Sequence, residues 1–342
     1  MKGSRAATPG AASGTVGSEE HSVQIEDIRR VGVAGGGTMG FGIAVNFALA
    51  GYPTVVYDLT YEVLERTLAN VRAALELFVE EGLVTRQQAD EAGARITTTT
   101  DLERLAAHSD FITEAIVERL ADKQELFGAL GRLCAPGCIV VSNTSRLQLS
   151  DIAVHFEHKD RTGLTHYFVP PHIVPGVEVA KGPGTSDQTY EIMCRLMRRT
   201  ARIPIPIRRE LPGYLINRLT AALSREALRL WAEGVATAED IELGVKSTIG
   251  FRMPFHGPFG HYDFSGTWRW PDDPAADRRP LPEPSEEVRA KIQARMAEHR
   301  PWFHDPDRIA EAAAVRDREF VRRRKALYGI PRYGPPAARN DP

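Results

Sequence analysis

Three glycines near the start of the chain restrict what it can fold into more than any other feature. Gly35, Gly37 and Gly40 follow the apolar run at 31–34 with the spacing G-x-G-x-x-G. In this spacing the first glycine permits a tight turn, the second lets the backbone approach a pyrophosphate, and the third allows close packing of a helix on a strand. The motif predicts a strand, a turn and a helix whose first amides face a phosphate group.

The segments on either side of the glycines make this motif more specific. With 29 glycines in 342 residues, the spacing alone also arises by chance. Here an apolar helical segment at 43–50 ends at Gly51, and a strand pattern at 54–58 follows, so the stretch has the form of a βαβ unit. We interpret the turn, with Thr38 and Met39 beside the three glycines, as a dinucleotide-binding site. A purely structural βαβ turn is the alternative.

Asp58 stands where the second strand of this unit ends. Its carboxylate can accept hydrogen bonds from the ribose of an adenosine, whereas a 2′-phosphate at that place would meet a like charge. The motif therefore favours NAD over NADP as the cofactor. The alternative is that Asp58 caps the following helix, because the same position is compatible with a helix cap.

The length and charge of the chain argue against several classes of protein. A chain of 342 residues with 42% hydrophobic content is long enough for two domains with a core each. The formal net charge of −2 gives no reason to expect nucleic acid or a membrane surface as a partner. No apolar run reaches the roughly 18 residues that a membrane-spanning helix needs. We expect a cytoplasmic protein.

The first residues and the cysteines also favour a cytoplasmic location. Residues 1–24 begin with a stretch rich in Gly, Ala, Ser and Thr that lacks the apolar core of a signal peptide, so we expect a disordered tail. Cys134, Cys138 and Cys194 have no spacing typical of a metal or redox site. We expect them to pack as small apolar side chains in a reducing compartment, and we predict no metal.

Strand and helix patterns alternate through the N-terminal part of the chain. After the βαβ unit, the spacing predicts helices at 61–80, 85–92 and 121–133, and strands around 96 and at 110–114 and 138–142. Asp101 is placed to cap a brief helix that ends before Ser109. Strands that alternate with helices indicate a mostly parallel, doubly wound sheet. We assign residues 25–208 to a Rossmann-type NAD-binding domain of the α/β class.

The character of the sequence changes near residue 209. The stretch 202–207 alternates Ile with Pro, which fits an edge strand because proline cannot donate to a β-ladder. A Leu-Pro-Gly break precedes a long helix at 214–233, and from there on the patterns are helical or proline-rich. We assign residues 209–330 to a helical domain for substrate binding and dimerisation, and 331–342 to a tail.

The C-terminal part contains one charged run whose meaning is open. A last helix is predicted at 307–327, after proline-rich loops at 268–274 and 279–284. The run Arg-Arg-Arg-Lys at 322–325 is either a solvated helix face, which is the usual meaning of such a run, or a surface for an acidic carrier or a phosphate.

Four polar residues stand where the ends of apolar strands, or the start of the long helix, would bring them together. They are Ser145, His166, Glu178 and Asn217. Ligands of open α/β sheets gather at the carboxyl ends of the strands, so these side chains are candidates for the chemistry. Each also has an ordinary structural alternative: a core histidine, a surface strand glutamate, or a helix-packing asparagine.

The sequence around these residues resembles the L-3-hydroxyacyl-CoA dehydrogenase family from residue 29 to residue 327. The similar stretches are Ser-Asn-Thr-Ser at 142–145, Arg-Thr-Gly-Leu-Thr-His-Tyr-Phe at 161–168, Pro-Gly-Tyr-Leu-Ile-Asn-Arg at 212–218, and Glu-Ala-Ile-Val-Glu at 114–118 with the following Lys123. The resemblance implies a Rossmann domain followed by an all-α domain like that at the C-terminus of 6-phosphogluconate dehydrogenase.

The resemblance also implies a role for each candidate. His166 is expected to be the base that accepts the hydroxyl proton, and Glu178 the carboxylate that orients its ring. Ser145 and Asn217 are expected to hydrogen-bond the substrate oxygen. The residues implied to line the NAD cleft are Ala115, Glu118, Lys123 and Asn143.

The chain departs from the family pattern at several positions. Val169 stands where members carry an asparagine expected near the nicotinamide, and Ala74 and Glu81 stand where coenzyme A-using relatives have a serine and a lysine. The segments 251–260 and 304–318 resemble the lambda-crystallin and L-gulonate 3-dehydrogenase branch, and carnitine dehydrogenases are also similar. The expected substrate is therefore a free hydroxy acid or an acyl thioester, including one on an acyl carrier protein.

Two other functions are alternatives to a hydroxyacyl dehydrogenase. A non-catalytic NAD-binding or crystallin-like protein would retain the fold without turnover. A β-hydroxyacid dehydrogenase of the 6-phosphogluconate type would need a glycine-rich lysine motif on the connecting helix, which we do not find.

The helix at 214–233 has more apolar surface than one amphipathic helix needs, so a homodimer is expected. The apolar residues are Leu215, Ile216, Leu219, Leu223, Leu228 and Trp231.

Overall fold

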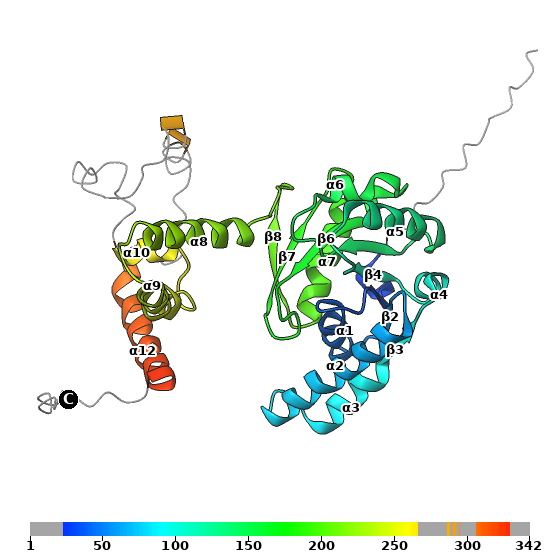
Figure 1. Ribbon diagram of the computed structural model, residues 1–342, viewed down its shortest axis with the longest axis horizontal. Coiled ribbons are helices and arrows are strands. Elements are labelled where there is room, and N and C mark those ends of the chain that lie inside the picture. The colour runs from blue at the N-terminus through cyan, green and yellow to red at the C-terminus, as the bar shows by residue number, and fades with distance from the viewer. Residues whose placement is uncertain (1–22, 266–285, 288–289, 292–293, 295–305, 329–342) are drawn as a thin grey trace, which may run out of the picture. The chain divides into compact units, whose positions relative to one another are not determined.

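The structure is a computed structural model that describes residues 23–265, 286–287, 290–291, 294 and 306–328 (Figure 1). The chain divides into two compact units between Ala222 and Leu223. This division lies inside helix α8 (Ile216–Ala232), so the domain boundary predicted at 209 stays a prediction. Both predicted proline-rich loops, and the predicted tails apart from residues 23–24, lie outside the described residues.

An eight-stranded sheet forms the centre of the first unit, in the order β3-β2-β1-β4-β5-β6-β7-β8. Neighbouring strands run parallel except for the antiparallel pair β6 and β7. This arrangement confirms the predicted Rossmann-like fold. The strands are β1 (Val31–Ala34), β2 (Thr54–Tyr57), β3 (Ile96–Thr99), β4 (Phe111–Glu114), β5 (Ile139–Ser142), β6 (Thr162–Tyr167), β7 (Gly176–Ala180) and β8 (Ile203–Ile207).

Helices cover both faces of this sheet (Figure 1). One buried cluster joins α1, α2, α3 and α7 to the sheet, and a second joins α4, α5 and α6 to the other face. Two covered faces explain why β1, β4 and β5 are buried along their whole length. The helices are α1 (Gly40–Leu49), α2 (Tyr61–Glu80), α3 (Arg86–Arg95), α4 (Leu102–Ala107), α5 (Leu120–Leu133), α6 (Leu149–Ile152) and α7 (Asp187–Arg199), with 3-10 turns η1 (Ile25–Asp27), η2 (Ala153–His155) and η3 (Lys159–Arg161).

Local sequence signals predicted α2, α4 and β8 correctly. Helix α2 has the predicted bounds, and the Thr60 hydroxyl accepts from the Val63 amide at 3.3 Å to begin it. Asp101 accepts from the amides of Glu103 and Arg104 at the start of α4, as predicted. Strand β8 is the last in the sheet and pairs only with β7, which confirms the predicted edge strand that accommodates two prolines.

The described part of the second unit is helical. Besides the end of α8, it has α9 (Ala238–Gly244), the π-helical turn η4 (Val245–Gly250), α10 (Gly260–Ser265), the 3-10 turn η7 (Pro306–Arg308) and α12 (Ile309–Tyr328). In the charged run on α12, Arg322 forms an ion pair with Glu319, and Arg323 donates to the carbonyl of Phe251. These contacts favour the helix-face interpretation. Within the described ranges, no helix combines the length and apolar character that crossing a membrane requires.

Candidate active site and cofactor-binding turn

The glycine turn lies at the point where the strand order reverses, after β1 and between β2 and β4. Gly35 has a φ of +104°, and a Cβ there would lie 2.5 Å from the carbonyl oxygen of Ala115. A Cβ on Gly40 would lie 1.7 Å from the carbonyl oxygen of Gly35, so these two positions admit only glycine. A Cβ on Gly37 would meet nothing within 4 Å. The turn therefore leaves its middle glycine open to a ligand, as a pyrophosphate-binding turn requires.

The side chains of Asp58 and the buried Thr67 form hydrogen bonds with the backbone of this turn. The Gly36 amide donates to Asp58 Oδ2 at 2.8 Å, and the Leu59 amide donates to Oδ1 at 2.7 Å. Thr60 caps α2, so the alternative role of Asp58 as a helix cap is wrong. The Thr67 hydroxyl donates to the Gly36 carbonyl at 2.8 Å. Sequence reasoning missed this residue, although a polar side chain at a buried position of the apolar face of α2 was a usable signal.

A buried ionic network lies next to the turn, where β4 and β5 end. Lys123 of α5 is almost fully buried and places Nζ 2.5 Å from Glu114 Oε1, while the Ser142 hydroxyl donates to Glu114 Oε2 at 2.6 Å. Burial raises the pKa of Glu114, and the Lys123 charge opposes that rise. Glu114 belongs to a motif that resembles the family, but nothing in the sequence identifies it as the partner of Lys123.

Glu118 connects this network to the turn that holds Ser145. Its Oε2 lies 3.2 Å from Lys123 Nζ. Its Oε1 accepts from the Thr144 hydroxyl at 2.5 Å and from the amides of Ser145 and Arg146 at 3.0 Å each. Burial acts to raise the pKa of Glu118, but the bond from Thr144 and the Lys123 charge outweigh it and hold that pKa below its usual range. A carboxylate with these donors fixes the backbone conformation of the turn.

Asn143 joins the ends of two neighbouring strands. It follows β5, and its Oδ1 accepts from the Tyr167 amide at the end of β6 at 2.8 Å. The bond holds the end of β6, which carries His166, beside the turn at 143–146. Because β1, β4, β5 and β6 are parallel, this end of the sheet is also the one at which the glycine turn lies.

His166 and Glu178 lie directly opposite each other in the antiparallel pair β6 and β7. His166 Nδ1 is 2.7 Å from Glu178 Oε2, and both side chains are buried. Since a carboxylate only accepts hydrogen bonds, the contact places the ring hydrogen on Nδ1 and leaves Nε2 as the acceptor. The His166 ring contacts those of Phe168 and Tyr214, at centroid distances of 4.6 and 5.9 Å.

The start of α8 is bound to the same glutamate. Glu178 Oε1 accepts from the amides of Leu215 and Ile216 at 2.9 and 2.7 Å. These amides belong to the first turn of a helix, where amides have no partner within the helix. Tyr214 has a φ of +45° and donates its hydroxyl to the Leu147 carbonyl at 2.6 Å. This turn explains why α8 begins at Ile216 and not at the predicted residue 214.

Asn217 reaches the turn at the end of β5 from α8. Its Nδ2 donates to the carbonyl of Ser145 at 3.3 Å. Three segments far apart in sequence therefore meet: the turn after β5, the pair β6 and β7, and the start of α8. The structure brings Ser145, Asn217, His166 and Glu178 into this one region, with Glu118, Lys123 and Asn143 beside them. Thr38 and Met39 lie at the start of α1, next to the glycine turn.

The loop after β6 carries Val169 and a buried histidine. Val169 is 65% exposed, whereas His172 is buried against the rings of Phe41 and Phe78. Burial, with the neighbouring Arg202 charge, lowers the pKa of His172, and its Nδ1 has no hydrogen-bond partner among the residues that the structure describes. Arg202 donates to the carbonyls of Pro171, His172 and Val174 at 3.2–3.5 Å and so holds the loop.

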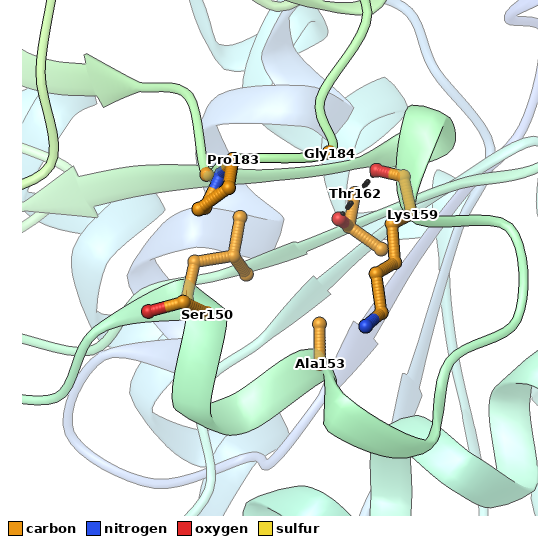
Figure 2. A pocket seen from close by; sticks show the side chains of 8 residues that line it. Ser150, Ala153, Lys159, Thr162, Pro183 and Gly184 are labelled. Carbon is orange, nitrogen blue, oxygen red and sulfur yellow. Dashed lines mark hydrogen bonds between the residues drawn. The ribbon is translucent and has the colours of Figure 1, made fainter.

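A shallow cavity lies elsewhere on the first unit (Figure 2). The Thr162 hydroxyl in its wall donates to the Lys159 carbonyl at 2.8 Å. Thr162 is the first residue of β6, so at about 3.3 Å per residue this wall is roughly 13 Å along the strand from His166. The cavity is not part of the candidate active site. It is lined by Leu149, Ser150, Ala153, Lys159, Thr162, Gly182, Pro183 and Gly184.

Comparison with known proteins relates the chain to one family. Residues 30–211 match the model of the 3-hydroxyacyl-CoA dehydrogenase NAD binding domain, and residues 213–271 match that of the 3-hydroxyacyl-CoA dehydrogenase C-terminal domain. The human mitochondrial hydroxyacyl-coenzyme A dehydrogenase is 33% identical over 244 residues, which cover 70% of this chain and 76% of that protein. The L-carnitine dehydrogenase of Streptomyces coelicolor is 31% identical over 241 residues, covering 70% and 74% of the two chains.

A solved structure gives the same result. The (S)-3-hydroxybutyryl-CoA dehydrogenase of Ralstonia eutropha superposes with a TM-score of 0.62 at 27% identity, covering 78% of this chain and 94% of that one. The family resemblance and the NAD cofactor expected from the sequence are thereby confirmed, while no relative here singles out the lambda-crystallin branch. The protein belongs to the 3-hydroxyacyl-CoA dehydrogenase family, and its N-terminal domain binds NAD.

Proposed function

We propose that the protein oxidises the C3 hydroxyl of a 3-hydroxyacyl compound to a ketone, with His166 as the base. The observation that supports this most directly is the 2.7 Å contact between His166 Nδ1 and Glu178 Oε2. It orients the ring so that Nε2 accepts the hydroxyl proton, and the Glu178 carboxylate stabilises the imidazolium that forms. NAD, when bound, accepts the hydride from the same carbon.

Ser145 and Asn217 complete the proposed site. Their segments touch through the 3.3 Å bond from Asn217 Nδ2 to the Ser145 carbonyl. Donors on two fixed segments are suited to hold the substrate oxygen while the carbonyl develops, since donors placed in advance do not need to reorganise during the reaction. The Glu118 bonds to the Ser145 turn and the Glu178 bonds to the start of α8 supply this rigidity.

We propose further that the protein is a homodimer that uses the apolar side chains of α8. Leu219, Leu223, Leu228 and Trp231 are 43–61% exposed. A second copy of the chain would cover such a face. Light scattering at micromolar concentration is expected to show twice the mass of the chain, and a purely monomeric sample would contradict the proposal.

The test of the proposed reaction follows the absorbance of the reduced cofactor. NAD is mixed with free L-3-hydroxybutyrate, its coenzyme A thioester and its acyl carrier protein thioester. We expect turnover with at least one of them, and a loss of roughly 10²- to 10⁴-fold in kcat for His166→Gln, the usual share of a general base. NAD binding, measured by calorimetry, should remain close to that of the unaltered protein.

His155→Gln serves as the matched control, because His155 is exposed on η2 and makes no contact with the candidate site. It should keep full activity. Undiminished turnover in His166→Gln would refute the role of this base. Tight NAD binding without turnover of any substrate would instead favour a non-catalytic NAD-binding protein.

A further inference from the structure

An arginine directly follows each of the two residues proposed to hold the substrate oxygen. Arg146 follows Ser145, and Arg218 follows Asn217. The two segments touch through the bond from Asn217 to the Ser145 carbonyl. Both arginines are exposed, and in the part of the chain that the structure describes neither forms an ion pair with a carboxylate. Neither guanidinium is therefore paired with a carboxylate of the described residues.

The carboxylate that contacts the backbone of Arg146 already has other partners. Glu118 Oε1 accepts from the Arg146 amide, and Glu118 Oε2 lies 3.2 Å from Lys123 Nζ. Glu118 thus fixes the backbone of Arg146, and its carboxylate shares the Lys123 ammonium with Glu114. Arg218 differs, because its guanidinium donates to the Pro212 carbonyl at 3.5 Å within the turn before α8. Arg146 is the one of the two whose guanidinium forms no hydrogen bond among the described residues.

We propose that Arg146 binds the carboxylate of a free 3-hydroxy acid and so selects this substrate class over neutral acyl derivatives. The inference rests on the proposed function. In a 3-hydroxy acid one methylene separates the hydroxyl-bearing carbon from the carboxylate. A substrate whose oxygen is held at Ser145 therefore presents its carboxylate close by, within range of the next residue. The planar guanidinium matches a carboxylate with two parallel hydrogen bonds.

A coenzyme A thioester would place different groups at this position. Its acyl carbonyl is neutral, and its phosphates lie beyond the long pantetheine arm. An arginine one residue from Ser145 is therefore too close to the reacting carbon to serve those phosphates while Ser145 holds the substrate oxygen. The position of Arg146 favours the carboxylate as its ligand.

The test compares three substrates that differ only at the acyl end: L-3-hydroxybutyrate, its methyl ester and its coenzyme A thioester. In Arg146→Ala we expect kcat/KM for the free acid to fall roughly 10- to 100-fold, the usual effect of losing a hydrogen bond to a charged group. The value for the methyl ester should stay within about twofold, because it has no charge to lose. Arg146→Lys should restore part of the loss, since it retains the charge but not the planar fork.

Arg132→Ala is the matched control, because Arg132 is an exposed arginine of α5 for which the described contacts give no ion pair. It should change none of the three values. Equal losses for acid and ester in Arg146→Ala would overturn the inference, as would a loss confined to the coenzyme A thioester, which would assign Arg146 to a phosphate. Failure of the acid to react in the unaltered protein, with turnover of either derivative, would overturn it as well.

A binding measurement separates this inference from the proposed reaction. The affinity of L-3-hydroxybutyrate for the protein saturated with reduced cofactor is measured by calorimetry, which needs no turnover. A loss of affinity in Arg146→Ala that Arg132→Ala lacks would support carboxylate binding even if the reaction were not observed. Unchanged affinity would exclude it while leaving the role of His166 intact.

Discussion

The cofactor-binding turn and the His166–Glu178 pair lie at the same end of one sheet but are built in different ways. The turn follows β1 and works through backbone groups, with Gly37 open and with Gly35 and Gly40 enclosed by the carbonyl oxygens of Ala115 and Gly35. The pair works through side chains from two antiparallel strands and depends on α8, whose first amides bind Glu178. We propose that a mainly steric device binds the cofactor and that a long-range, polar one supports the chemistry.

This difference predicts which substitutions each region tolerates. In the turn, the free space around a Cβ decides whether a side chain is admitted, and the chemical type of the neighbours matters little. At the pair, size matters less than whether each buried donor keeps an acceptor, because an unsatisfied buried donor costs about 1–3 kcal/mol. Substitutions at the two places should therefore fail for different reasons.

The largest effect is expected from substitution of the glycines, which tests the steric account of the turn directly. Gly40→Ala places a methyl group 1.7 Å from the Gly35 carbonyl oxygen, so the turn must open, and we expect loss of NAD binding together with a lower melting temperature. Gly37→Ala meets no atom within 4 Å, so it should keep the melting temperature and lose only cofactor affinity. Calorimetry and thermal unfolding check both. Equal melting temperatures of the two variants would refute the steric account.

The next effect concerns Glu178. Glu178→Ala leaves His166 and the amides of Leu215 and Ile216 without their acceptor, and we expect it to lower the free energy of unfolding by about 1–3 kcal/mol for each unsatisfied donor. Glu178→Gln retains an oxygen for the two amides but presents its NH₂ to His166, so it should lose less stability and still lose activity. Denaturant unfolding and kcat separate the variants. Equal stability of the two would show that the bonds to α8 contribute little.

The smallest effect is a pH dependence that arises at neither region but in the loop after β6. The pKa of His172 is lowered by burial, so the folded state favours the neutral ring. The unfolded chain, with a histidine pKa of about 6.5, binds a proton first as pH falls. This contribution to stability is therefore complete above about pH 6.5 and is lost as pH falls toward the lowered pKa of the folded state.

Melting temperatures between pH 8 and pH 5 measure this dependence. His172→Phe keeps an aromatic ring against Phe41 and Phe78 but cannot titrate, so its melting temperature should fall less over that range than that of the unaltered protein. Parallel curves for the two proteins would remove His172 as the source. Because no contact among the described residues joins the His172 ring to His166 or Glu178, kcat at pH 7.5 serves as the control and should change little.

Local rules account for the parts of the fold that were predicted correctly. The bounds of α2 followed from apolar spacing and the Thr60 cap, and the edge position of β8 followed from prolines that cannot donate. The need for glycine at position 40 followed from a steric limit within the turn, whereas at position 35 packing against Ala115 adds a second limit. The candidate residues Ser145, His166, Glu178 and Asn217 were named from their places at strand ends and at the start of the long helix, and the roles that the family resemblance implies stay predictions.

The sequence by itself determined the βαβ unit, the alternation of strands and helices and the need for glycine at position 40, because each depends on neighbours along the chain. Only the tertiary structure decided that Glu178 binds both His166 and the start of α8, that Glu114 is the buried partner of Lys123, and that Thr67 holds the glycine turn. These contacts join residues that are distant in sequence. Which buried donor meets which acceptor is settled when the strands and helices pack, because a buried polar group must find a partner wherever packing places one.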